Sequence, residues 1–98
     1  MKRVLVLRSL AEVDLAEIAA WYERRHARLA SRFLDAFDVA AAELLGEPMI
    51  HALIEAPVRR VLMKSFPYHI YYVVDADRVI VLGIYHAARH PDTWRERL

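Results

Sequence analysis

Apolar residues recur at helical spacing through two stretches in the first half of the chain. Those of the first stretch fall at positions i, i+3, i+4 and i+7 of one helical face: Leu15, Ile18, Ala19 and Tyr22. Ser9 and Glu12, just before them, have the spacing of a capping box, in which each side chain accepts a hydrogen bond from the backbone N–H of the other residue. A helix is therefore predicted to begin near Leu10, with Asp14 pointing away from the core.

The same spacing resumes after residue 29. It is formed by Ala30, Phe33, Leu34, Phe37, Ala41 and Leu44. The pattern stops at Gly46, with Pro48 just beyond, and a glycine followed by a proline is typical of a helix end. A second helix of similar length is therefore predicted, and the turn between the two helices is placed near residues 25–28.

The second half of the chain changes to period-two patterning rich in β-branched residues. Residues 58–63, 68–74 and 79–85 are predicted to be three strands, and the short links between them favour an antiparallel meander. The last strand is apolar on both faces, with Ile80, Leu82 and Ile84 on one side and Val79, Val81 and Tyr85 on the other. It is therefore expected to be central, and a short N-terminal strand within residues 2–8 is expected to lie beside it.

These elements predict an α+β fold in the order β-α-α-β-β-β. A mainly antiparallel four-stranded sheet would pack against a helical hairpin in two layers. Residues 46–57 are interpreted as a loop, and residues 91–98 as a short helix with Pro91 in its first turn. The aromatic residues at helical spacing are expected in the core: Trp21, Tyr22, Phe33 and Phe37. Three tyrosines of the strands are expected to be half-buried: Tyr71, Tyr72 and Tyr85.

Length and composition narrow the class of protein. The 98 residues are enough for one domain, 1–98, and 57% of them are hydrophobic. Without cysteine there is no disulfide framework, thiolate zinc site or cysteine nucleophile, which suits a reducing compartment. Residues 1–8 do not resemble a targeting segment, and the longest uncharged apolar run, 79–88, is about half of what a membrane-spanning helix needs. We expect a cytoplasmic protein with no membrane partner.

Hydropathy and charge add two expectations. The mean hydropathy of +0.14 is high for a thin two-layer domain, which cannot bury all of its apolar surface, so another chain is expected to cover part of it. The formal net charge is +1, and residues 50–98 contain seven Lys/Arg against five Asp/Glu. This surplus is too small for a general nucleic-acid coat but leaves room for a local basic patch.

Several motifs occur in order along these predicted elements. They are A-E-V-D-L-A-E-I-A-A-W-Y at residues 11–22, Ala30 with Phe33, Pro48, Val58-Arg59, F-P-Y-H-I-Y-Y at 66–72, V-I-V-L at 79–82, and His86, Arg89, Pro91 and Trp94. With these motifs the chain resembles, nearly end to end, the RelE/ParE superfamily of toxins from type II toxin-antitoxin systems. The resemblance implies a RelE/ParE-like fold of the same element order. It also implies a cognate antitoxin as the protein partner that covers the toxin.

One branch of the superfamily, RelE-like, cuts mRNA on the ribosome. Such cleavage needs converging cations and a titratable group, and the branch pattern has five functional positions. Here the first is matched by Arg60, the second is Leu62 in place of a cation, and the third is His69 in place of arginine. Arg89 matches the fourth, and the terminal tyrosine falls at or beside Trp94. About two of the five positions survive, which weakens the ribonuclease reading.

The ribonuclease remains an alternative, with the ribosome and mRNA as partners and with Arg60, His86 and Arg89 as its catalytic residues. His86 would act as the acid or base. Arg89 could instead hold the C-terminal tail through Asp92 or Glu96.

The other branch, ParE-like, inhibits DNA gyrase and stalls it on cleaved DNA. The F-P-Y hairpin and the ending from His86 to Trp94 are more similar to this branch and its plasmid-stabilisation relatives, which we favour. On this interpretation no residue need be catalytic. The residues expected to bind the target are Arg59, Arg60, Lys64, Arg78, His86, Arg89 and Trp94. An inactive relative that only binds an antitoxin is the third possibility.

No metal, cofactor or small-molecule substrate is expected. His86 and His90 are four residues apart, like helical metal ligands, but their segment crosses a strand end. It contains no nearby cysteine, glutamate or third histidine.

Overall fold

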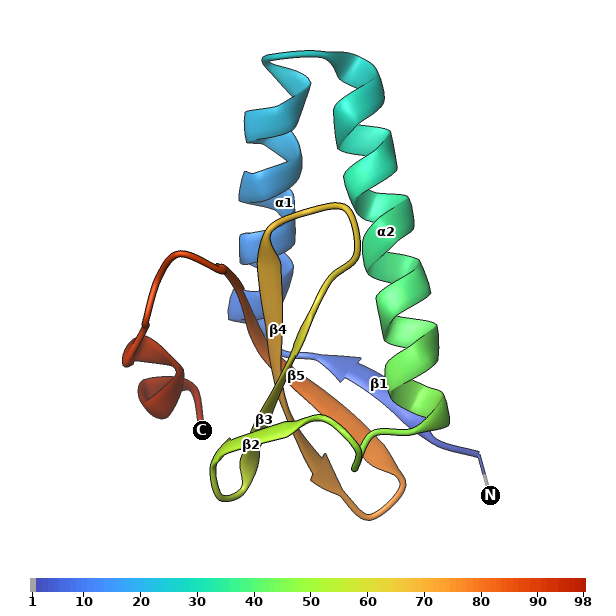
Figure 1. Cartoon of the computed structure of the whole chain (residues 1–98), viewed down its shortest axis with the longest axis vertical. Coiled ribbons are helices and arrows are strands. Elements are labelled where there is room, and N and C mark those ends of the chain that lie inside the picture. The colour runs from blue at the N-terminus through green and yellow to red at the C-terminus, as the bar shows by residue number, and fades with distance from the viewer. Residues whose placement is uncertain (1) are drawn as a thin grey trace.

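The computed structural model describes residues 2–98, so Met1 of the predicted domain 1–98 lies outside the described residues. Its elements are β1 (Val4–Leu7), α1 (Ser9–Glu23), α2 (Ala27–Gly46), β2 (Ala52–Glu55), β3 (Val58–Leu62), β4 (Tyr68–Asp75), β5 (Arg78–His86) and the short 3-10 helix η1 (Thr93–Arg97). The two helices lie side by side as a hairpin, and the C-terminal segment lies on the α1 side of the molecule (Figure 1).

The strands form one sheet in the order β1-β5-β4-β3-β2. The three predicted strands form an antiparallel meander, and β1 pairs parallel to β5 along the other side of that strand. The α+β class, the helical hairpin, the mainly antiparallel sheet and the inner position of β5 are therefore confirmed. The turn between the helices, at residues 24–26, lies next to the predicted position.

The predicted loop at residues 46–57 was wrong in one respect, because it contains the edge strand β2. This strand pairs only with β3, and all four of its residues are exposed. Exposure on both faces removes the alternation of apolar and polar residues by which a half-buried strand is recognised. The sheet therefore has five strands rather than four.

The helix-facing side of the sheet carries the larger part of the core. Phe33, Phe37 and Leu44 of α2 are buried there against residues of β4 and β5, and α1 contributes partly buried side chains such as Ile18 and Tyr22. Of the predicted helical core positions, Leu34 is 41% exposed and does not belong to this cluster. Trp21 is also 41% exposed, so its prediction as a core aromatic was wrong. Its ring instead lies 3.4 Å from the Arg25 guanidinium.

The capping box predicted at Ser9 is not formed. The helix begins at Ser9 itself, Arg8 is the N-cap residue, and no side chain caps this end. The backbone explains the shift, because the Arg8 N–H still donates to the Val81 carbonyl at 3.1 Å while the Arg8 carbonyl already accepts from Glu12 N–H at 3.1 Å. Arg8 is thus both the last link to the sheet and the N-cap residue of the helix.

A β-bulge in β5 overturns the predicted division of this strand into two faces. Tyr71 is opposite Gly83 but Tyr72 is opposite Val81, so Leu82 is an extra residue on β5. Beyond it the alternation is reversed: Ile84 packs with Val79 and Val81 under the helices, whereas Tyr85 packs with Ile80 and Leu82 on the other face. The bulge therefore directs Tyr85 toward the C-terminal segment.

The face of the sheet opposite the helices is partly covered by the C-terminal segment. Trp94 of η1 is 3% exposed and stacks on Tyr71, with ring centroids 6.3 Å apart. Pro91 precedes η1 rather than starting it, so the predicted helix is shorter and of the 3-10 type. Tyr71, Tyr72 and Tyr85 are at most 8% exposed, so the expectation that they are half-buried was wrong.

Among residues 2–98, no helix has both the length and the apolar character needed to cross a membrane.

Candidate functional site

An open groove of about 1130 Å³ lies between α1 and the C-terminal segment. Residues of α1, from Leu10 to Tyr22, line one side. The end of β5 lies between the two sides, and residues from Ala88 to Arg97 line the other side. Residues 10–22 and 84–97, which are distant in the sequence, therefore form most of this groove, together with Pro67 and Tyr68.

A salt bridge between Asp14 of α1 and Arg97 of η1 joins the two sides. The Arg97 Nη1 to Asp14 Oδ2 distance is 2.6 Å, and both side chains are only 15% exposed. The same pair also forms hydrogen bonds with backbone groups of β5 beyond the end of β1. Ile84 N–H donates to Asp14 Oδ2 at 3.0 Å, and Arg97 Nη1 donates to the Leu82 carbonyl at 3.2 Å. We call these two residues the clasp. The prediction that Asp14 points away from the core was wrong, because it meets unpaired backbone groups of β5.

Glycine at position 83 is required by the clasp. A Cβ atom there would overlap Arg97 Nη1 and lie 3.0 Å from Asp14 Oδ2, so any side chain would displace the salt bridge. Gly83 therefore serves close approach rather than a special backbone angle.

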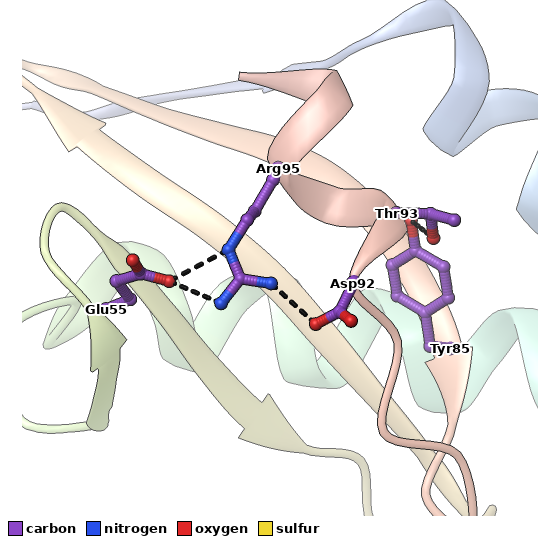
Figure 2. Close-up of polar contacts among 5 residues, drawn as sticks. All are labelled: Glu55, Tyr85, Asp92, Thr93 and Arg95. Carbon is purple, nitrogen blue, oxygen red and sulfur yellow. Dashed lines mark hydrogen bonds and ion pairs between the residues drawn. The ribbon is translucent and has the colours of Figure 1, made fainter.

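Three further contacts hold the C-terminal segment in place (Figure 2). Arg95 donates to Glu55 Oε2 at 2.6 and 3.0 Å and to Asp92 Oδ1, which links η1 to the edge strand β2. The Thr93 hydroxyl lies 3.2 Å from the Tyr85 hydroxyl. The role considered for Arg89, holding the tail through Asp92 or Glu96, is thus carried out by Arg95 and Arg97.

The opposite end of the groove from the clasp is formed by Tyr22, Tyr68, His86 and Arg89. The rings of Tyr68 and His86 are 5.3 Å apart, and those of Tyr22 and Tyr68 are 6.4 Å apart. Burial and a hydrogen bond with Tyr22 raise the pKa of Tyr68 to about 12, while the positive charge of Arg89 acts in the opposite direction. His86 and Arg89 are exposed, and within residues 2–98 Arg89 makes no ion pair. We call these four residues the basic end of the groove.

The other predicted target-binding residues do not join this site. Arg59 donates to the carbonyls of Met49 and His51, at 3.1 and 2.8 Å, and so fixes the segment before β2. Arg60 donates to the Tyr71 hydroxyl at 3.2 Å on the sheet face opposite the helices.

Lys64, Arg78 and Trp94 lie in three further places. Lys64 forms an exposed salt bridge with Glu43 of α2, and Arg78 forms one with Asp75 at the β4–β5 turn. Trp94 is buried against the sheet. Of the seven predicted residues, only His86 and Arg89 line the same groove.

His69, which stands where the RelE pattern has arginine, is a further titratable residue. Its Nδ1 atom is buried without a hydrogen-bond partner, and burial, followed by the charge of Arg60, lowers the pKa of the ring. No three metal-ligating side chains come together anywhere in the described chain.

The clasp was missed because its partners are 83 residues apart. One signal was present: Asp14 falls three residues after Ala11 and four before Ile18, so it lies at the edge of the predicted apolar face of this helix. A carboxylate in that position indicates a partner on the core side.

Comparison with known proteins settles the family. A family model described as the ParE toxin of type II toxin-antitoxin system, parDE, matches residues 5–91. The chain belongs to the ParE toxin family. No curated protein sequence matches this ParE-family chain.

Two solved structures share the fold of this ParE-family toxin. A chromosomal ParDE toxin-antitoxin system from P. aeruginosa aligns with a TM-score of 0.76 and 17% identity, over 87% of this chain and 96% of that one. A mutant of the E. coli toxin RelE in the free state aligns with a TM-score of 0.68 and 14% identity, over 99% and 94%. At these identities the likeness concerns the fold alone.

Proposed function

We propose that this ParE-family toxin inhibits growth by acting on DNA gyrase in the cytoplasm and is neutralised by a cognate antitoxin. The ParE branch of the superfamily was favoured from the sequence motifs, and the family model supports the same branch. The target, the antitoxin and the cellular location belong to the proposal.

The observation that supports the proposal is how the residues on which RelE-like cleavage would depend are bonded and buried. Arg60 is engaged with the Tyr71 hydroxyl, and Leu62, which is 55% exposed, offers no cation beside it. Trp94 is buried and has no hydroxyl group. Cleavage of a phosphodiester needs several groups converging on one phosphate. Arg60, Leu62 and Trp94 do not provide such a set, which favours a toxin that binds rather than one that cleaves.

The ribonuclease alternative needs Arg60, His86 and Arg89 to act on one scissile bond. The groove contains His86 and Arg89, but Arg60 does not line it. The alternative is therefore weaker than the gyrase proposal, and the same experiment tests both.

We expect the basic end of the groove to contact the target, because His86 and Arg89 are its exposed cationic or titratable groups. An antitoxin segment lying in the groove would cover them. It would also bury part of the exposed apolar surface of α1, which includes Leu10 and Trp21. Inhibition and neutralisation would then compete for one surface.

The test uses one purified preparation of the toxin in two assays. With DNA gyrase, we expect loss of supercoiling and accumulation of cleaved DNA; in a cell-free translation reaction, we expect full-length product and intact mRNA. Arg89→Gln should weaken the gyrase effect, whereas Arg32→Gln, an exposed arginine of α2 outside the groove, should not. Cut mRNA with unaffected gyrase would establish the ribonuclease instead. Inactivity in both assays would leave an antitoxin-binding relative.

A further inference from the structure

The basic end of the groove brings together several side chains that can donate hydrogen bonds. The His86 Nδ1 atom accepts from the Ala88 N–H at 3.0 Å, so in the neutral ring the proton is on Nε2, which is then a donor. Arg89 adds a guanidinium that has no carboxylate partner within residues 2–98. Tyr22 and Tyr68 add two phenol groups at the same end. Such a set suits a small anion that accepts several hydrogen bonds.

The charges along the rest of the groove decide which class of anion fits. Asp14, Glu17 and Glu96 line it together with Arg89 and Arg97, so three carboxylates face two guanidinium groups. The clasp already neutralises Asp14 with Arg97, which leaves Glu17 and Glu96 as acidic groups. A nucleic-acid strand carries a negative charge at every phosphate and would meet these carboxylates. A polypeptide can place one carboxylate at the basic end and a cation or neutral group elsewhere.

Apolar side chains beside the basic end favour the same class of ligand. Trp21, next to Tyr22 on α1, is 41% exposed, and Pro67 and Ala88 also line the groove at this end. A bound segment would therefore gain apolar contacts on both sides of its charged residue.

We propose that the basic end of the groove binds the side-chain carboxylate of an acidic residue from the antitoxin, flanked by apolar residues of the same segment. Arg89 pairs with the carboxylate, and His86 and one hydroxyl of the hydrogen-bonded pair Tyr22 and Tyr68 complete its hydrogen bonds. Glu17 and Glu96 favour a basic residue elsewhere in that segment. The inference rests on the proposed function only in naming the antitoxin as the source of the segment.

The probe is the peptide acetyl-Ala-Leu-Glu-Leu-Lys-amide, with the matched peptide containing Gln in place of Glu. Each is titrated into the full-length ¹⁵N-labelled toxin, and backbone amide shifts are followed by NMR. We expect the Glu peptide to shift the amides of His86, Ala88 and Arg89 and to bind at least fivefold more tightly than the Gln peptide. In Arg89→Gln the ratio should fall below twofold. In Arg32→Gln, the matched control, it should be unchanged.

Equal affinity of the two peptides, absence of shifts at the basic end, or persistence of the ratio in Arg89→Gln would overturn the carboxylate site. The NMR spectrum of each variant also reports whether it is folded. The gyrase assay is independent of these titrations. A toxin that discriminates the peptides but leaves gyrase unaffected would retain the carboxylate site and refute the gyrase target.

Discussion

Replacement of Arg97 by methionine tests whether the clasp holds the C-terminal segment. Methionine retains an unbranched apolar stem beside Tyr85 but removes the salt bridge to Asp14 and the hydrogen bond to the Leu82 carbonyl. Removing one partner of a fully buried ion pair costs about 3–5 kcal/mol. Here both side chains keep 15% exposure, and Asp14 retains the hydrogen bond from Ile84 N–H. We therefore expect the free energy of unfolding to fall by about 2–3 kcal/mol.

The assay is urea and thermal unfolding at pH 7, where this loss corresponds to a fall in Tm of roughly 10–20 °C for a chain of this length. Arg95→Met is the matched control, because Arg95 also ties η1 to distant residues but its carboxylate partners, Glu55 and Asp92, are mainly exposed. Its effect should be clearly smaller. A double-mutant cycle with Asp14→Asn should give a coupling energy of about 1 kcal/mol or more. Equal effects of the two arginine variants, or a coupling energy near zero, would refute the role of the clasp.

Three other substitutions have defined outcomes. Because the pKa of His69 is lowered in the folded state, the unfolded chain protonates this residue first as pH falls below about 6.5, so stability should decline from there toward the folded-state pKa. His69→Gln should remove this contribution to the pH dependence of unfolding measured from pH 5 to 8, and an unchanged pH dependence would contradict the assignment. Tyr72→Phe removes the buried hydrogen bond from the Tyr72 hydroxyl to the Pro48 carbonyl, 2.6 Å long, and should destabilise by about 1–2 kcal/mol in urea unfolding; no loss would mean that water satisfies the carbonyl. Ala76 has a φ of 56° in the β4–β5 turn, and Ala76→Gly should raise the free energy of unfolding by about 0.5–1 kcal/mol, measured as a raised urea midpoint. A lowered midpoint would show that the turn is not strained.

The candidate site could be predicted only in part. His86 and Arg89 were selected from a local motif, and they line the groove because they follow the end of β5 within a few residues. Arg59, Arg60, Lys64 and Arg78 were selected for their charge, but charge does not reveal partners. In the fold each of them is engaged by a nearby carbonyl, hydroxyl or carboxylate.

The sequence by itself determined the helices, the meander and the order of the elements, because these depend on periodicity and on turns between neighbouring segments. The sequence did not reveal edge strand β2, because its exposed residues lack alternation, or the bulge at Leu82, which depends on the register between β4 and β5.

Only the tertiary structure decided the groove. Its two sides come from opposite ends of the chain and are joined by Asp14, Gly83 and Arg97. The physical reason is that β1 ends opposite Val81 while β5 continues, which leaves backbone groups that require partners. Residues far apart in the sequence provide those partners, and no local pattern in the sequence specifies that they meet.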